Sequence, residues 1–204
     1  MKFAACFFCF FLYVGGVLGQ PRLGPFHTLG VKDGLSQSSV AFMLRDSRGF
    51  MWLSSVDGLN RFDGRSVRVY RPNVGQPNAI FGGNVQSSFF EDKASGDLWF
   101  STYEGINCYR RVSDDFAHFR LLDSQGKPYT EGYHVVFRGS DGWLWVHVDD
   151  KNVPLGGVLY RFEPKTGRQV RIGELGGLRF RGRYNYRRRG SAGVRLASDR
   201  KRRI

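Results

Sequence analysis

The sequence predicts an all-β fold: a partial β-propeller of about three four-stranded blades that follows an N-terminal signal helix. One motif occurs three times, and its tryptophans, Trp52, Trp99 and Trp145, lie about 46 residues apart. Each copy also offers four apolar runs of strand length, which is the content of one propeller blade. Beyond the N-terminus no segment keeps an apolar period of 3.6 residues, so we expect no further helix.

The apolar runs are rich in β-branched and aromatic residues and are separated by turn residues. The expected strands are 40–45, 50–55, 59–62 and 67–70 in the first copy, 85–91, 98–102, 106–110 and 116–121 in the second, and 133–138, 143–148, 158–162 and 169–172 in the third.

Glycines recur at two turns of each copy. We expect them to adopt positive φ, which a Cβ atom would hinder. They are Gly49, Gly96 and Gly142 between the first and second strands, and Gly58, Gly105 and Gly157 between the second and third.

An aspartate opens the first turn of each copy, at Asp46, Asp92 and Asp141. We expect each carboxylate to close its turn by accepting hydrogen bonds from the local backbone. Calcium binding is the alternative, but the sequence has no dense Asp-x-Asp-x-Asp loop of the kind that calcium sites use.

The three repeat tryptophans are expected to fill the gaps between neighbouring blades. A two-sided sheet of this size cannot bury both faces alone, and a large ring covers the most area per residue. The alternative is an aromatic ladder on which sugar rings stack.

Motifs that would indicate catalysis are missing from the sequence. The histidines are scattered, without the close spacing of a typical zinc site; they are His27, His118, His134 and His147. No nucleophile elbow, phosphate-binding loop or kinase motif is present. We therefore expect no catalytic residue, no cofactor and no metal ion, and a chain that is not an enzyme.

The N-terminus is typical of a secretory signal peptide. Residues 1–19 combine Lys2, an apolar run and small residues before a cleavage position after Gly19. An uncleaved membrane anchor is the alternative. Cleavage would remove Cys6 and Cys9, so Cys108 would remain as a buried apolar residue with no partner for an internal disulfide.

The C-terminal segment differs in composition from the repeats, which we place within 20–178. Residues 179–204 carry 11 of the 31 Lys and Arg residues and one acidic residue, Asp199, and the whole chain has a formal net charge of +13. We expect this segment to be disordered and to result from a lost reading frame. A functional basic tail is the alternative, although we expect no nucleic-acid partner for an exported protein.

The repeat resembles the two-component regulator propeller repeat, whose pattern is Asp-x-x-Gly-x-apolar-Trp followed by a small residue pair and Gly. The segments Phe26-His-Thr-Leu and Asp33-Gly-Leu-Ser-Gln resemble the start of the N-terminal sensor region of hybrid two-component histidine kinases. The resemblance covers about residues 25–172, and the third copy matches it only in part.

The resemblance implies a truncated periplasmic sensor, whose full-length relatives signal to a histidine kinase and sense an oligosaccharide or another small extracellular ligand. It also implies that kinase domains and a later membrane span belong to such relatives and not to this chain. A secreted stand-alone binding module is the first alternative, and a propeller lyase or hydrolase fragment is the second. We expect bare blade faces to promote self-association.

Overall fold

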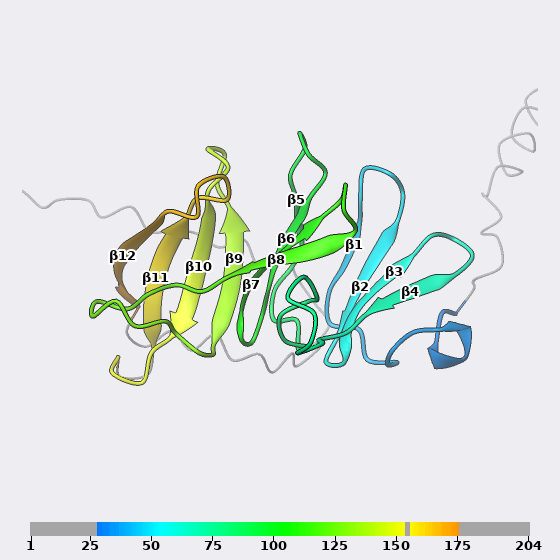
Figure 1. The fold of residues 1–204 in the computed structure, drawn as a ribbon, viewed down its shortest axis with the longest axis horizontal. Helices are drawn as coiled ribbons and strands as arrows, with labels where there is room; N and C mark the ends of the chain where they lie inside the picture. The colour runs from blue at the N-terminus through cyan, green and yellow to red at the C-terminus, as the bar shows by residue number, and fades with distance from the viewer. Residues whose placement is uncertain (1–27, 154–155, 176–204) are drawn as a thin grey trace, which may run out of the picture.

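The computed structural model describes residues 28–153 and 156–175, which form three four-stranded antiparallel sheets in a row (Figure 1). The predicted fold class is confirmed. The strands are β1 (Met43–Arg45), β2 (Met51–Ser55), β3 (Gly58–Phe62) and β4 (Val67–Tyr70) in the first blade, β5 (Phe90–Glu91), β6 (Leu98–Thr102), β7 (Gly105–Arg110) and β8 (Asp115–Phe119) in the second, and β9 (Tyr133–Arg138), β10 (Leu144–Asp149), β11 (Gly157–Phe162) and β12 (Gln169–Leu175) in the third.

A 3-10 turn, Val31–Asp33, precedes the first blade. Within the described residues no helix is long and apolar enough to cross a membrane. The expected signal peptide, the residues Phe26 and His27 and the basic tail lie outside the described residues.

The first strand of the second blade is shorter than expected. The sequence predicts a strand over 85–91, whereas β5 covers only Phe90–Glu91. The reason is a side chain in the ladder: the Ser87 hydroxyl, 2.8 Å away, accepts the hydrogen bond from the backbone N–H of Ser101. Strand-like pairing returns as an isolated bridge between Val85 and Thr102.

The blades pack face to face around two apolar clusters. The cluster between the first and second blades consists of Trp52, Leu59, Tyr70, Ile80, Val85, Phe89, Leu98, Phe100, Tyr109 and Phe116. The cluster between the second and third blades includes Trp99, Ile106, Cys108 and, from the third blade, Leu144, Val146, Val148, Val158, Tyr160 and Phe162. Large rings and branched side chains dominate both clusters, and burial of this area drives the stacking of the blades.

The repeat tryptophans occupy matching positions in the sheets, because each lies on the second strand opposite a residue of the third. The pairs are Trp52 with Arg61, Trp99 with Cys108, and Trp145 with Arg161. Their surroundings differ.

Trp52 is fully buried, with its ring centroid 4.6 Å from that of Tyr109 in the second blade. Trp99 likewise lies 5.9 Å from Phe162 of the third blade. Trp145 is only partly buried, and it stacks at 5.2 Å on Phe137 of its own blade. Its neighbours Leu144 and Val146 face the second blade, so Trp145 is on the opposite face of the sheet.

The turn glycines follow the expectation at four of six positions. Positive φ occurs at Gly49, Gly96, Gly142 and Gly58. Gly105 and Gly157 do not adopt positive φ, so the expectation was wrong for them. Glycine is needed there because the chain approaches closely: a Cβ atom on Gly105 would lie 2.9 Å from the carbonyl oxygen of Phe119, and one on Gly157 would collide with the Val148 carbonyl.

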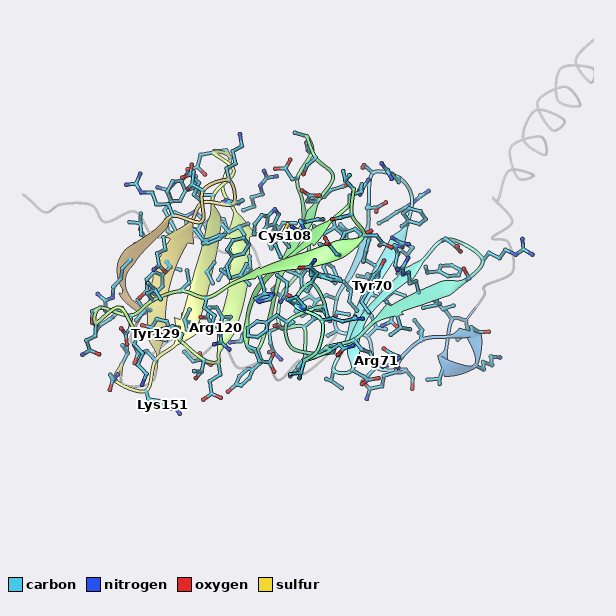
Figure 2. The ribbon with its side chains drawn as sticks, viewed as in Figure 1. Tyr70, Arg71, Cys108, Arg120, Tyr129 and Lys151 are labelled. Atoms are coloured by element: carbon cyan, nitrogen blue, oxygen red, sulfur yellow. The ribbon has the colours of Figure 1, made fainter. Side chains whose placement is uncertain are left out.

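Cys108 is buried and makes no disulfide within the described residues (Figure 2). Its side chain belongs to the cluster between the second and third blades. Burial, with a smaller contribution from the charge of Asp97, raises the pKa of the thiol to about 12.

Candidate functional site

The turn aspartates of the repeat accept backbone hydrogen bonds in all three blades. Asp46 accepts from the N–H groups of Arg48 at 2.9 Å and Phe50 at 3.0 Å. Asp92 accepts from Ala94 and Ser95, and Asp141 accepts from Trp143. Each carboxylate therefore uses one oxygen to hold the turn between the first two strands.

The second oxygen of each turn aspartate contacts an arginine. Asp46 pairs with Arg111 of the second blade at 3.0 Å, and Asp92 pairs with Arg138 of the third blade at 2.7 Å. Asp141 pairs with Arg161 of its own blade. The first two ion pairs connect neighbouring blades at the edge where the turns meet.

At this edge, the junction between the first and second blades is nearly closed. The Arg111 side chain is 7% exposed and also contacts Glu91 at 2.8 Å. Beside it, Asp114 accepts hydrogen bonds from the Tyr70 and Tyr109 hydroxyls at 2.7 and 2.8 Å. The pocket at this edge, which Asp46, Trp52 and Arg61 help to line, is about 190 Å³. A separate pocket of about 470 Å³ is lined by residues of β4, of the loop 75–80 and of β8, and by Asp114.

The carboxyl group of Asp114 has a lowered pKa. Burial alone would raise it, but this effect is outweighed by the hydrogen bonds from Tyr70 and Tyr109 and by the charges of Arg61 and Arg68. Asp114 therefore stays ionised at neutral pH and connects the two blades through charged hydrogen bonds.

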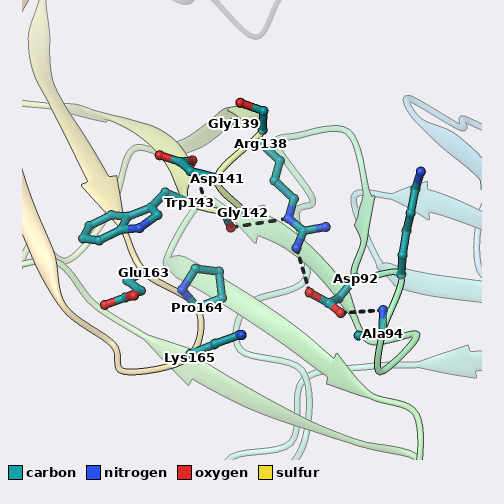
Figure 3. Close-up of a pocket in the computed structure, with 12 residues that line it drawn as sticks. Asp92, Ala94, Arg138, Gly139, Asp141, Gly142, Trp143, Glu163, Pro164 and Lys165 are labelled. Carbon is teal, nitrogen blue, oxygen red and sulfur yellow. Dashed lines mark hydrogen bonds and ion pairs between the residues drawn. The ribbon is translucent and has the colours of Figure 1, made fainter.

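The corresponding junction between the second and third blades is open and holds a pocket of about 700 Å³ (Figure 3). We call it the junction pocket. It is lined by Asp92, Lys93, Ala94, Arg138, Gly139, Ser140, Asp141, Gly142, Trp143, Glu163, Pro164 and Lys165. These residues come from the first turns of the second and third blades and from the turn between β11 and β12.

Arg138 forms one wall of the junction pocket. Its guanidinium donates to the carbonyl oxygen of Gly142 at 3.4 Å and to Asp92 (Figure 3). It also donates to the carbonyl oxygen of Glu91 at 3.1 Å. The backbone N–H of Ser95, together with Arg138, lowers the pKa of the Asp92 carboxyl. This wall of the pocket is thus formed by the ion pair of Arg138 with Asp92, which further hydrogen bonds hold in place.

The opposite side of the junction pocket offers an aromatic ring and charged side chains. Trp143 is partly exposed, and the guanidinium of Arg161 lies 4.7 Å from its ring centroid. In Figure 3 the Lys165 side chain extends toward the Asp92 side of the pocket. Three acidic and three basic side chains line the pocket, so their formal charges balance: Asp92, Asp141, Glu163, Lys93, Arg138 and Lys165.

Of the repeat residues selected from the sequence, Asp92, Asp141 and Gly142 line the junction pocket, while Asp46 and Trp52 line the smaller one. The other selected residues, Trp99, Trp145, Gly49, Gly96, Gly58, Gly105 and Gly157, line neither.

Sequence reasoning missed Arg111, Arg138, Trp143 and Lys165. Arg111 lies in the turn between the third and fourth strands, whereas Arg138 lies on a first strand. Each of these two arginines pairs with the turn aspartate of the preceding blade. They do so from different repeat positions, so the repeat pattern does not predict them.

The described residues also contain one group that could hold a metal ion, formed by His134, His147 and Asp149. The histidine spacing gave no sign of it, because the two rings come from neighbouring strands. Burial, with a smaller contribution from His134, lowers the pKa of His147 to about 4, so this imidazole is neutral at neutral pH.

Comparison with known proteins shows a short sequence match and a shared fold. No family model matches the chain. A segment of 48 residues is 46% identical to histidine kinase P4 of Formosa agariphila, and covers 24% of this chain and 4% of that protein.

Two solved structures from B. thetaiotaomicron share the fold. The extracellular domain of the hybrid two-component system BT3049 matches with a TM-score of 0.60 and 21% identity, over 72% of this chain and 20% of that chain. The extracellular domain of the one-component system BT4673 matches with a TM-score of 0.54 and 22% identity, over 72% of this chain and 21% of that chain. This chain thus shares its fold with part of the extracellular domains of such systems, and it spans about a fifth of the length of each.

Proposed function

We propose that this chain is part of an exported, periplasmic ligand-sensing propeller that signals to a histidine kinase, and that its ligand is an oligosaccharide bound in the junction pocket. The chain acts by binding and not by catalysis. The likeness to extracellular domains of two-component systems supports the sensing role.

The lining of the junction pocket is the observation that carries the ligand assignment. Its balanced charges favour a neutral ligand over an ionic one, because a charged ligand would meet like and unlike charges equally. Its carboxylates accept hydrogen bonds, its lysines donate them, and Trp143 offers an apolar ring surface. A neutral molecule with many hydroxyl groups and apolar C–H patches meets all three requirements.

Two lysines of the junction pocket are available to a ligand. Within the described part of the chain, Lys93 and Lys165 make no side-chain hydrogen bond or ion pair, unlike Arg138, which is held by Asp92. Hydroxyl groups of a ligand can therefore accept hydrogen bonds from these ammonium groups without breaking a protein contact.

Calorimetric titration of the purified chain with a panel of neutral tetrasaccharides (cello-, manno-, xylo- and galactotetraose) tests the proposal. We expect saturable binding of at least one of them. Lys165→Ala should weaken that binding about tenfold, as expected for the loss of one charged hydrogen bond, and should leave the unfolding midpoint unchanged.

Lys127→Ala is the matched control, because Lys127 is exposed in the loop after β8 and away from the junction pocket. It should bind as the wild type does. Failure of all four sugars to bind would contradict the carbohydrate assignment. Equal losses in the two lysine variants would contradict the position of the site.

A further inference from the structure

Three side chains with metal-binding atoms converge at the end of the third blade where β9 begins and β10 ends, the lower end in Figure 1. His134 pairs directly with His147 across the two strands. Directly opposed residues of an antiparallel pair point to the same face of the sheet, and so do residues two apart on one strand. Asp149 therefore joins the two histidines on that face.

An irregularity in the sheet produces this register. The pairing of β9 with β10 shifts between Trp145 and Val146, so that His134, rather than its neighbour, faces His147. Such bulges redirect side chains and occur preferentially next to functional sites.

The distances from the two histidines to Asp149 fit a shared ion. The Nε2 atom of His134 lies 3.6 Å from Oδ2 of Asp149, and the Nδ1 atom of His147 lies 3.7 Å from Oδ1 of Asp149. These separations exceed hydrogen-bond range. Tetrahedral ligands at about 2.1 Å from zinc are roughly 3.4 Å apart, and the ligand atoms of all three residues lie within 4.8 Å of one another.

The third blade departs from the repeat at the positions that create this group. Two residues after the repeat tryptophan, the first and second blades have Ser54 and Ser101, whereas the third has His147. The two serine hydroxyls accept hydrogen bonds from the backbone N–H groups of Phe42 and Val135. They therefore help to align first strands, whereas the imidazole of His147 faces a second histidine.

The same contrast holds two residues further along the chain in each blade. There the first and second blades have Val56 and Tyr103, and the third has Asp149. Both changes introduce metal-ligating side chains, and they do so within one blade and on one face of its sheet.

We propose that His134, His147 and Asp149 form a binding site for a divalent transition-metal ion, with zinc as the best fit. Two imidazole nitrogens and one carboxylate are ligands that zinc takes, and three protein ligands leave a fourth position open. The ion can reach the site from solvent on the side of Asp149, because that side chain is 52% exposed. The His147 side chain is fully buried and forms the inner side of the site. Lys151, at the same end of the molecule (Figure 2), pairs with Glu131 at 3.3 Å and is not one of the three ligands.

Two glycines make the close approach at this site possible. A Cβ atom on Gly157 would lie 2.5 Å from Nε2 of His147, and one on Gly132 would lie 2.7 Å from Cβ of Asp149. Side chains at either position would displace a ligand, so both positions require glycine.

Calorimetric titration of the full, metal-free chain with ZnCl₂ tests the site, with the visible absorption of Co²⁺ as a second readout of coordination. We expect one saturable site in the wild type. His147→Ser, which restores the residue of the other two blades, and Asp149→Asn, which keeps the size of the side chain, should each weaken zinc binding at least about tenfold. Both should lose the Co²⁺ bands of four-coordinate geometry.

His118→Ala is the matched control, because His118 lies on β8 and stacks on Phe81, outside the group. It should bind zinc as the wild type does. Unfolding midpoints in EDTA establish that each variant folds. If His147→Ser does not fold, zinc binding by the exposed Asp149→Asn variant alone tests the site. The absence of a saturable site in the wild type, or unchanged binding in Asp149→Asn, would overturn the proposal.

Discussion

The indole Nε1 of Trp52 donates a 2.9 Å hydrogen bond to Oδ2 of Asp46. The same carboxylate oxygen accepts a 3.0 Å hydrogen bond from Arg111 of the second blade. The side chains of Arg111 and Asp46 are only 7% and 1% exposed. One turn aspartate thus holds its own turn, orients the packing tryptophan and binds the next blade.

Replacing Asp46 should destabilise the fold strongly. Asp46→Ala leaves the buried guanidinium of Arg111 without one of its carboxylates and Trp52 without its acceptor, so we expect a loss of about 3 kcal/mol in the free energy of unfolding. Asp57→Ala is the control, since Asp57 pairs with Arg71 on the surface, where both side chains are more than half exposed. It should change stability by less than about 1 kcal/mol. Urea denaturation compares the two, and similar losses would argue against the junction as described.

The tryptophans should differ in their contribution to stability. Trp52→Ala creates a large cavity between two blades and should lower the free energy of unfolding by about 3–5 kcal/mol. Trp145→Ala removes a partly exposed ring from the outer face of the third blade, and we expect less than half of that loss. The comparison uses urea denaturation followed by far-UV circular dichroism. Equal losses would mean that the outer face of the third blade is as fully packed as the junctions.

Acid should weaken the junction between the second and third blades. The pKa of Asp92 is lowered in the folded chain, chiefly by the backbone N–H of Ser95 and also by Arg138. A lowered folded-state pKa stabilises the fold above the unfolded-state pKa of about 3.9, and this contribution disappears as pH falls through the folded-state value. We expect the urea concentration at the unfolding midpoint to decrease as the pH is lowered below about 4. In Asp92→Asn this decrease should be less steep. The same dependence of the urea midpoint on pH in the wild type and in Asp92→Asn would contradict the stabilising role of the Asp92 carboxylate.

Cys108 should be inert while the chain is folded. Its thiol is buried with a pKa of about 12, so almost no thiolate is present at neutral pH. In a Cys6→Ser/Cys9→Ser background, a disulfide reagent should label Cys108 at least about 100-fold faster in urea than in buffer. Rapid labelling in buffer would show that the second and third blades separate readily.

The repeat predicts the blades because its signals are local. Strand-length runs and the turn glycines act within one copy, and the hydrogen bonds of Asp46 to Arg48 and Phe50 span only a few residues. Contacts between blades carry no such signal: Arg138 and Asp92 are 46 residues apart, and Arg111 and Asp46 are 65 apart. They also use different repeat positions.

The two candidate sites depend on contacts between strands and between blades, which the repeat pattern does not specify. The second junction, where the junction pocket lies, keeps the turn aspartate Asp92 but has no counterpart of Arg111 at the same repeat position. The facing of His134 and His147 depends on a register shift that alternation along one strand does not specify. Both features require the arrangement of strands in space.

The central claim, that a neutral oligosaccharide binds in the junction pocket, is tested most directly by the indole N–H signals in a ¹⁵N-resolved NMR spectrum. The chain has 4 tryptophans, so Trp52, Trp99, Trp143 and Trp145 each give one signal. On titration with the tetrasaccharide panel, the signal of Trp143, assigned with Trp143→Phe, should shift progressively to saturation while those of Trp52 and Trp99 stay in place. A spectrum in which the Trp143 signal does not move, or in which only the buried tryptophans respond, would contradict the account.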